Sequence, residues 1–198
     1  MNSTPLKFRL LPAAGKIFRI IKSNIYVNET LILYEHDKNT YQETVAKITY
    51  ITPENVSDVL DFQDFQHPRY KPAFEGFLRR GDTGYFAYLK GKCVHRSWVV
   101  NMPTKVHLHP MLPRQLNERE AFIHYCETAP HARGRNIYPA VLSKIAEDFK
   151  KDGRTLMISA NAKNSSSIKG IVKSGFREKE RTRIIVLFGI KFKKSFKL

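Results

Sequence analysis

The sequence predicts a domain of the mixed α/β class, and three observations carry this prediction. Short runs rich in β-branched and aromatic residues, typical of strands, alternate along the chain with stretches of helical periodicity. The chain has 198 residues, the size of one ordinary domain, and 42% of them are hydrophobic, which is enough for a full core. No internal repeat, low-complexity tract or Gly/Ser-rich linker divides it.

Residues 1–27 are expected to form an N-terminal extension ahead of a single domain that spans residues 28–198. In the extension, Ala14, Ile17 and Ile21 share one face of a predicted helix, while basic residues occupy another. Two interpretations of this basic amphipathic helix stay open. It packs on the core of the domain, or it lies on an anionic membrane surface.

The first half of the domain is expected to hold four strands and one helix. The strands are residues 29–37, 45–52, 84–90 and 93–100. Residues 52–65 read as a capped helix that begins after Pro53. The pair Gly91-Lys92 joins the last two strands and predicts a hairpin.

The second half begins with residues 104–117, whose prolines and histidines indicate a loop over a surface or a site. The elements expected after it are a strand at 120–128, a long helix at 137–153, a strand at 154–160, a short helix within 161–176, and a strand or strand pair at 181–192. In the long helix, Val141, Leu142 and Ile145 recur at helical spacing, and Gly153 is a typical helix stop. The resulting order is β–β–α–β–β–β–α–β–α–β.

Charge and cysteine usage limit the function classes. The formal net charge of +16 predicts an anionic partner, which is nucleic acid, anionic lipid or a phosphorylated small molecule, unless the surface is basic without a specific partner. Cys93 and Cys126 are too few for a disulfide framework, and the histidines lack metal-binding spacing, so no metal is expected. The sequence shows no apolar signal-peptide core and no run of about 20 apolar residues, which predicts a cytoplasmic protein.

The most informative stretch, residues 127–145, joins a strand to the long helix. The first N–H groups of a helix have no intrahelical partner and lie at the positive end of its dipole, so such a turn is able to bind an anion. The dipole alone contributes only about 0.3–1 kcal/mol. A diphosphate therefore needs several amides together with Arg133 and Arg135, which flank the turn. A basic surface loop without a ligand is the alternative.

Residues 128–138, T-A-P-H-A-R-G-R-N-I-Y, resemble the phosphate-binding element of the GCN5-related N-acetyltransferases (GNAT), V-x-P-x-x-R-G-x-G-x-G/A. A second family element is similar too: a strand, then Asn164, then a short helix that ends in Lys-Ser-Gly-Phe at residues 173–176. The resemblance covers residues 121–188 well and the first hundred residues only in element order. It implies an α+β fold with a mostly antiparallel central sheet flanked by helices.

The resemblance also implies a ligand, acetyl-coenzyme A or a related acyl-coenzyme A. Its pyrophosphate is expected at the amides of Arg133, Gly134, Arg135, Asn136, Ile137 and Tyr138. The pantetheine arm is expected to pair like an added strand with the edge formed by Cys126, Thr128 and Ala129, with Asn164 on its other side.

Three positions depart from the family pattern. Asn136 replaces a glycine that lets the backbone approach the pyrophosphate, although asparagine tolerates unusual backbone angles better than most residues. Tyr138 replaces a second small residue, so its ring must point into the core or over the cofactor. Ile171 stands where many relatives have the tyrosine that protonates the leaving thiolate, and no substitute acid is evident. Weaker cofactor binding or a degenerate site follows from the first two.

His124 is the candidate general base, because a group with a pKa near neutrality deprotonates an ammonium efficiently. Some relatives, the arylalkylamine N-acetyltransferases among them, have a histidine at this position. Strand alternation predicts that His124 shares a face with Cys126, and that Glu127, the alternative base, points to the other face. A histidine satisfied within the sheet is the competing interpretation. The candidate acceptor-binding residues are His95, Trp98, His107 and His109, with core packing or loop exposure as alternatives.

The leading hypothesis is therefore direct acetyl transfer from acetyl-coenzyme A to an amine or, with less support, a hydroxyl. The pattern resembles bacterial members that act on sugars in surface-polysaccharide pathways, which makes an amino sugar the first acceptor to consider. The alternative is a non-catalytic basic module for nucleic acid or an anionic membrane, since residues 149–198 hold fourteen Lys/Arg against three acids. No RRM-like or zinc-finger pattern favours nucleic acid.

Overall fold

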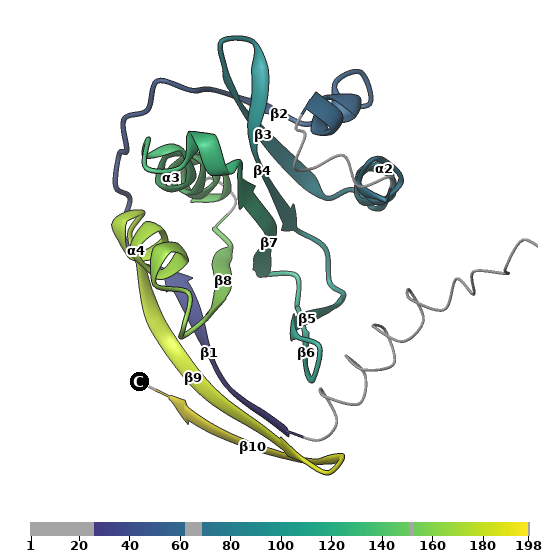
Figure 1. The fold of residues 1–198 in the computed structure, drawn as a ribbon, viewed down its shortest axis with the longest axis vertical. Coiled ribbons are helices and arrows are strands. Elements are labelled where there is room, and N and C mark those ends of the chain that lie inside the picture. Colours follow the sequence, from purple (N-terminus) through teal and green to yellow (C-terminus); the bar gives the residue numbers. More distant parts are fainter. Residues whose placement is uncertain (1–25, 62–68, 151–152, 198) are drawn as a thin grey trace, which may run out of the picture.

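An eight-stranded sheet forms the centre of the structure, a computed structural model that describes residues 26–61, 69–150 and 153–197 (Figure 1). The strand order is β10-β9-β1-β8-β7-β4-β3-β2, and of the seven pairings only that of β7 with β8 is parallel. The strands are β1 (Tyr26–His36), β2 (Lys47–Tyr50), β3 (Thr83–Leu89), β4 (Lys92–Val100), β7 (Glu120–Thr128), β8 (Thr155–Asn161), β9 (Phe176–Leu187) and β10 (Ile190–Lys197). The expected mixed, mostly antiparallel sheet is thus confirmed.

Helices cover both faces of this sheet: α3 and α4 lie on one side and α2 on the other (Figure 1). Their bounds are α2 (Tyr70–Arg80), α3 (Ile137–Lys150) and α4 (Ser165–Lys173), with short 3-10 helices η1 (Val56–Asp61) and η3 (Pro130–Ala132). The apolar face expected for α3 is buried, since Val141, Leu142 and Ile145 are fully inaccessible to solvent. Burying such a side chain stabilises the fold by about 1.5–3 kcal/mol each.

Two expected elements differ from the structure, and one helix was not expected. Residues 104–117 form a hairpin, β5 (Lys105–His109) and β6 (Leu112–Gln115), and not a loop. The helix expected over 52–65 is only the 3-10 turn η1 within the described residues. Helix α2 was not expected at all, because Pro72 and Gly76 interrupt its sequence; the proline is tolerated in the first turn. The expected basic extension lies outside the described residues up to residue 25.

Strand β7 contains a bulge that decides how the site is built. Residues 96–98 of β4 lie opposite residues 124–127 of β7, so Tyr125 and Cys126 together face the single Ser97. Tyr125 adopts a left-handed backbone with φ +54°. An extra residue of this kind reverses the alternation of the side chains that follow it.

Candidate functional site

The turn between β7 and α3 presents free backbone donors, as the sequence predicted. Gly134 and Asn136 both have left-handed backbones, with φ of +77° and +58°. Within the part of the chain that the structure describes, the N–H groups of residues 134–138 donate to no other group. Together with the positive end of the α3 dipole they form an anion-binding concavity.

The side chain of Asn136 holds this turn in place. Its Nδ2 donates to the carbonyl oxygen of Glu43 at 2.7 Å, and its Oδ1 accepts from Nζ of Lys173 at 2.8 Å. Thr40 and Gln42 in turn donate to the carbonyl oxygen of Lys173. Asparagine therefore supplies the left-handed backbone of the family glycine and also ties the turn to α4 and to the β1–β2 connection.

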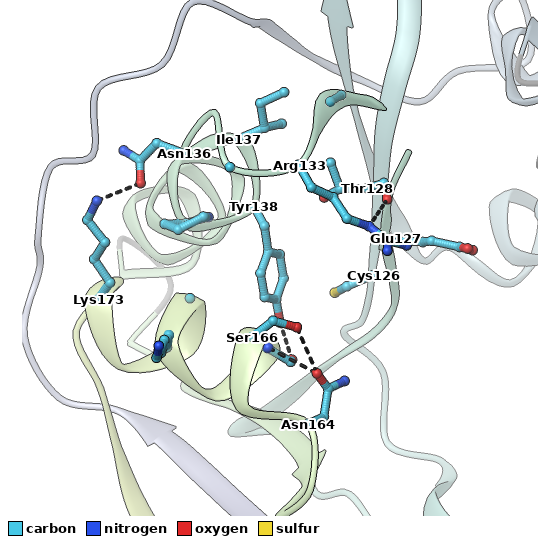
Figure 2. A pocket seen from close by; sticks show the side chains of 16 residues that line it. Cys126, Glu127, Thr128, Arg133, Asn136, Ile137, Tyr138, Asn164, Ser166 and Lys173 are labelled. Carbon is cyan, nitrogen blue, oxygen red and sulfur yellow. Dashed lines mark hydrogen bonds between the residues drawn. The ribbon is translucent and has the colours of Figure 1, made fainter. Parts of the chain in front are cut away.

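A cavity of about 790 Å³ opens at this turn, between the end of β7 and the first turns of α3 and α4 (Figure 2). The expected cofactor residues that line it are Cys126, Thr128, Arg133, Gly134, Asn136, Ile137, Tyr138 and Asn164. Lys169 and Lys173 also line it and make it electropositive. Sequence reasoning missed both lysines as site residues, although they occupy i, i+4 positions on α4.

Two of the expected cofactor residues do not line the cavity. Ala129 is fully buried, and its N–H donates to the carbonyl oxygen of Val94 at 3.0 Å, because β4 still flanks the chain there. Arg135 is exposed on the outer side of the turn, where its carbonyl oxygen accepts from Oγ1 of Thr44 at 3.4 Å. Of the two arginines in the motif, only Arg133 contributes to the cavity wall.

The ring of Tyr138 crosses the cavity from α3 to α4 (Figure 2). Its hydroxyl lies 3.3 Å from Oγ of Ser167, and its ring packs on Gly170, where an added Cβ would lie 2.6 Å from the ring. Burial raises the pKa of the phenol well above its ordinary value. The ring therefore lines the cavity and packs against the core at the same time, and Gly170 makes room for it.

Asn164 has a structural task that the family comparison did not suggest. Its Oδ1 accepts from the N–H of Ser167 at 3.1 Å and from the hydroxyl of Ser166 at 3.0 Å, so it is the N-cap of α4. The capping geometry keeps this side chain at the cavity wall. Ile171 lies on the buried face of α4 with no solvent exposure, so this position contributes packing and no hydroxyl.

His124 lies on the face of the sheet opposite to Cys126, which corrects the expected alternation. Its ring packs edge-on against Phe77 of α2, with ring centroids 5.1 Å apart, whereas Cys126 lines the cavity beside α3. The bulge at Tyr125 causes this reversal. It also places Glu127 on the α2 face, where this carboxylate pairs with Arg96.

Arg96 is itself fixed on the α2 face, since its guanidinium lies 4.0 Å above the ring of Tyr70. Tyr125 stands beside it and is 47% exposed, which leaves an open aromatic surface next to His124. The α2 face therefore presents an open aromatic surface on the other side of the sheet from the cavity.

Asp82 is a neighbour of His124 that sequence reasoning missed. Its buried carboxylate lies 3.8 Å from Nε2 of His124 and pairs with Arg80. Burial raises the pKa of this carboxyl, but the interactions with His124 and Arg80 lower it, and the net shift is downward. The sequence signal was weak, because Asp82 follows Gly81 in an ordinary helix-to-strand connection.

The expected acceptor residues are not gathered around one pocket. Trp98 is fully buried, with its ring centroid 5.2 Å from those of both Phe74 and Phe77, so it belongs to the core. His107 is exposed on β5, and Nε2 of His109 lies 2.9 Å from the carboxylate of Glu29. Core packing, one of the two alternatives, describes Trp98, whereas His107 and His109 lie on strand β5 and not in a loop.

His95 is the most deeply buried histidine of the candidate set. Its Nδ1 lies 2.7 Å from Oγ1 of Thr128 and its Nε2 lies 2.8 Å from Oγ of Ser97. Burial, with a smaller contribution from Arg96, lowers the pKa of His95 to about 3. A neutral His95 therefore supports the cavity floor beside Tyr138, with ring centroids 5.8 Å apart, and does not act as a base.

Comparison with known proteins identifies the fold. Neither a protein-family profile nor a curated protein sequence matches this chain. A GNAT-family acetyltransferase from Colwellia psychrerythraea aligns with a TM-score of 0.59 at 15% identity, covering 96% of this chain and 76% of its own. The chain has the GNAT fold.

Two further solved structures with the GNAT fold agree with this assignment. A GCN5-related N-acetyltransferase-like protein from Streptococcus suis gives a TM-score of 0.56 at 13% identity, over 88% of this chain and 68% of its own. The GCN5-related glucosamine N-acetyltransferase region of a fungal multi-domain β-N-acetylglucosaminidase gives 0.55 at 13% identity, over 96% of this chain and 25% of that protein. Identities this low establish the fold and leave the activity to be argued from the site.

Proposed function

We propose that this protein is an acyltransferase that moves an acetyl group from acetyl-coenzyme A directly to an amine. The observation that carries the proposal is the set of unpaired amides at residues 134–138, placed at the mouth of an electropositive cavity that follows the end of β7. The GNAT fold supports it, since the sequence of this turn resembles the phosphate-binding motif of that family.

The residues present fit the diphosphate end of such a co-substrate. The amides of residues 134–138 would hold the diphosphate oxygens, and Arg133, Lys169 and Lys173 would balance their charge. For the arm, β7 offers a free edge, since its pairing with β8 ends at Ile123. The arm fits only after the ring of Tyr138 turns aside.

Bound acetyl-coenzyme A would supply an activated acyl carbon where β7 leaves β8. His124, on the other face of the same strand, would take a proton from the acceptor ammonium. The free amine would then attack the acyl carbon, and the C–N bond would replace the C–S bond as the coenzyme A thiolate leaves. Asp82 would stabilise the imidazolium that forms, at the 3.8 Å separation seen here. Ile171 leaves the departing thiolate without the usual tyrosine, so we expect a slow enzyme, by roughly 10²–10⁴-fold for one absent acid.

An amino sugar is the acceptor class that we propose to test first. The sequence pattern suggests it, and the glucosamine N-acetyltransferase region named above supports it. The exposed Tyr125, together with Glu127 on the same face, would suit a sugar ring and its hydroxyls. Arg96 orients Glu127 and is itself buried.

The test is a thermal-shift titration with acetyl-coenzyme A, followed by a transfer assay against glucosamine, aliphatic amines, arylalkylamines and peptides, with products read by mass spectrometry. We expect a rise in Tm and transfer to an amine that His124→Gln abolishes without loss of the Tm shift. No shift at millimolar co-substrate contradicts the proposal. Transfer to peptides and not to sugars would replace the acceptor class alone.

A further inference from the structure

The β9–β10 hairpin carries an exposed apolar face. It lies at the β10 end of the sheet, opposite to the β2 end in the strand order. Directly opposite residues in antiparallel strands share a face. The row next to the turn is Tyr26, Leu187 and Ile190, which are 57%, 44% and 61% exposed. The next row pairs Ile185 with Phe192, which is 55% exposed.

Farther from the turn the same face becomes basic. Arg183 pairs with Lys194 in the third row, and in the fourth row Arg181 pairs with Phe196, which is 49% exposed. The cations on this face are therefore Arg183, Lys194 and Arg181, of which Arg181 forms an ion pair with Glu178. The face thus runs from an apolar end at the turn to a cationic band behind it.

The turn itself contains a phenylalanine whose apolar ring is exposed to solvent and whose backbone conformation is unfavourable for a bulky residue. Phe188 is 78% exposed and has a left-handed backbone with φ +47°, followed by Gly189 with φ +82°. A bulky side chain is unfavourable at such a position, where a two-residue hairpin prefers asparagine or glycine. The arrangement gains stability if the ring is buried against a partner.

We propose that this hairpin docks on an anionic lipid surface. The apolar turn, Leu187 to Ile190, would enter the boundary between headgroups and acyl chains, and Arg183 and Lys194 would lie at the level of the lipid phosphates. The inference rests on the register, exposure and charge of the hairpin, and it is independent of the proposed acyltransferase activity.

Two other partners fit this face less well. A second copy of the chain pairing along the β10 edge would bring its lysines against those of the partner, an arrangement that lysine-rich edge strands disfavour. Nucleic acid would suit the cations and the exposed rings of Phe188 and Phe192, but it leaves the aliphatic Leu187 and Ile190 without a favourable contact, since these cannot stack on bases. Lipid hydrocarbon suits these two side chains, because removing apolar surface from water is favourable whatever the shape of the side chain.

The experiment is co-sedimentation of the full chain with vesicles of phosphatidylcholine, with and without phosphatidylserine. We expect binding that requires phosphatidylserine and weakens with salt. Phe188→Asn keeps a favourable turn and should weaken binding about tenfold or more. Lys194→Gln should weaken it about fivefold.

Lys90→Asn is the matched control, because Lys90 and Gly91 form the same kind of turn in the β3–β4 hairpin, with φ of +49° and +76°. That turn lies at the opposite end of the molecule (Figure 1). We expect Lys90→Asn to bind vesicles as the wild type does, and all variants to have a Tm at least as high as that of the wild type.

Several results would overturn the proposal. One is no sedimentation with phosphatidylserine vesicles at low salt, and another is full binding by Phe188→Asn. A dimer that Phe188→Asn dissociates in sedimentation velocity would assign the face to a second copy. A single-stranded oligonucleotide that binds tightly and loses affinity in Phe188→Asn would assign it to nucleic acid.

Discussion

Replacing Tyr138 by alanine should strengthen the binding of acetyl-coenzyme A, although the substitution removes a half-buried aromatic side chain. The ring spans the cavity between the phosphate-binding turn and α4, in the path proposed for the cofactor arm. In the wild type, the co-substrate must displace the ring before the arm can lie along β7. When only a fraction of the molecules is in the conformation that binds, the apparent Kd rises by the inverse of that fraction.

The contacts of the ring set the size of the effect. Burying a large apolar side chain fully is worth about 1.5–3 kcal/mol, so a half-buried ring contributes about 1 kcal/mol. The hydrogen bond between Tyr138 and Ser167, 3.3 Å long, adds about 1 kcal/mol. Displacement thus costs about 2 kcal/mol, which predicts a Kd about thirtyfold lower in Tyr138→Ala.

Calorimetric titration with two ligands checks this reasoning. Tyr138→Phe keeps the ring and loses only the hydrogen bond, so its gain should be about fivefold. Adenosine 3′,5′-bisphosphate has no arm and should bind all three proteins equally. Unchanged or weaker binding of acetyl-coenzyme A by Tyr138→Ala refutes the obstruction. Failure of both ligands to bind any variant refutes the proposed function instead.

Three further outcomes are expected. In urea unfolding, the free energy of unfolding of the wild type should fall by about 2 kcal/mol between pH 6.5 and 5, because His95 takes up a proton in the unfolded chain but not in the folded one, where its pKa is lowered to about 3. His95→Gln should show a weaker pH dependence, and equal slopes for the two proteins would contradict this reasoning. Gly175→Ala should lower the stability by about 2–3 kcal/mol, since its Cβ would overlap the carbonyl oxygen of Lys38 at a φ of +84°, and an unchanged Tm would contradict this. Asp82→Asn should lower kcat about tenfold to a hundredfold with the Kd for acetyl-coenzyme A unchanged, because the Asp82 carboxylate positions His124. A change in Kd alone would assign Asp82 a different role.

The fold was largely predictable wherever the hydrophobic residues recur with a single spacing, that of a helix or that of a strand. The helical spacing of Val141 and Ile145 gave the buried face of α3, and Gly153 marked its end. Helix α2 escaped prediction because Pro72 and Gly76 suppress its local propensity, and its packing through Phe74 and Phe77 on Trp98 outweighs that deficit. Tertiary contacts of this kind have no local signal.

The site was predictable as a turn and not as a three-dimensional arrangement. The motif located the free amides and the left-handed Asn136, because both depend on a few adjacent residues. The position of the Tyr138 ring depends on Gly170, which is distant in sequence and becomes meaningful only when α3 and α4 meet. Read together, a large residue at 138 and a glycine at 170 would have been the available signal.

The bulge at Tyr125 explains how one strand could serve both halves of a transfer reaction. With regular alternation, His124 and Cys126 would point to one face, and a base there would compete with the cofactor for the same cavity. The extra residue leaves Cys126 facing α3 and the phosphate-binding turn, and His124 facing α2 and Asp82. The last pairing of β7 with β8 is at Ile123, directly before His124. Deletion of Tyr125 would make His124 and Cys126 neighbours in a regular strand, on opposite faces as in the wild type, so transfer should continue when the products are read by mass spectrometry.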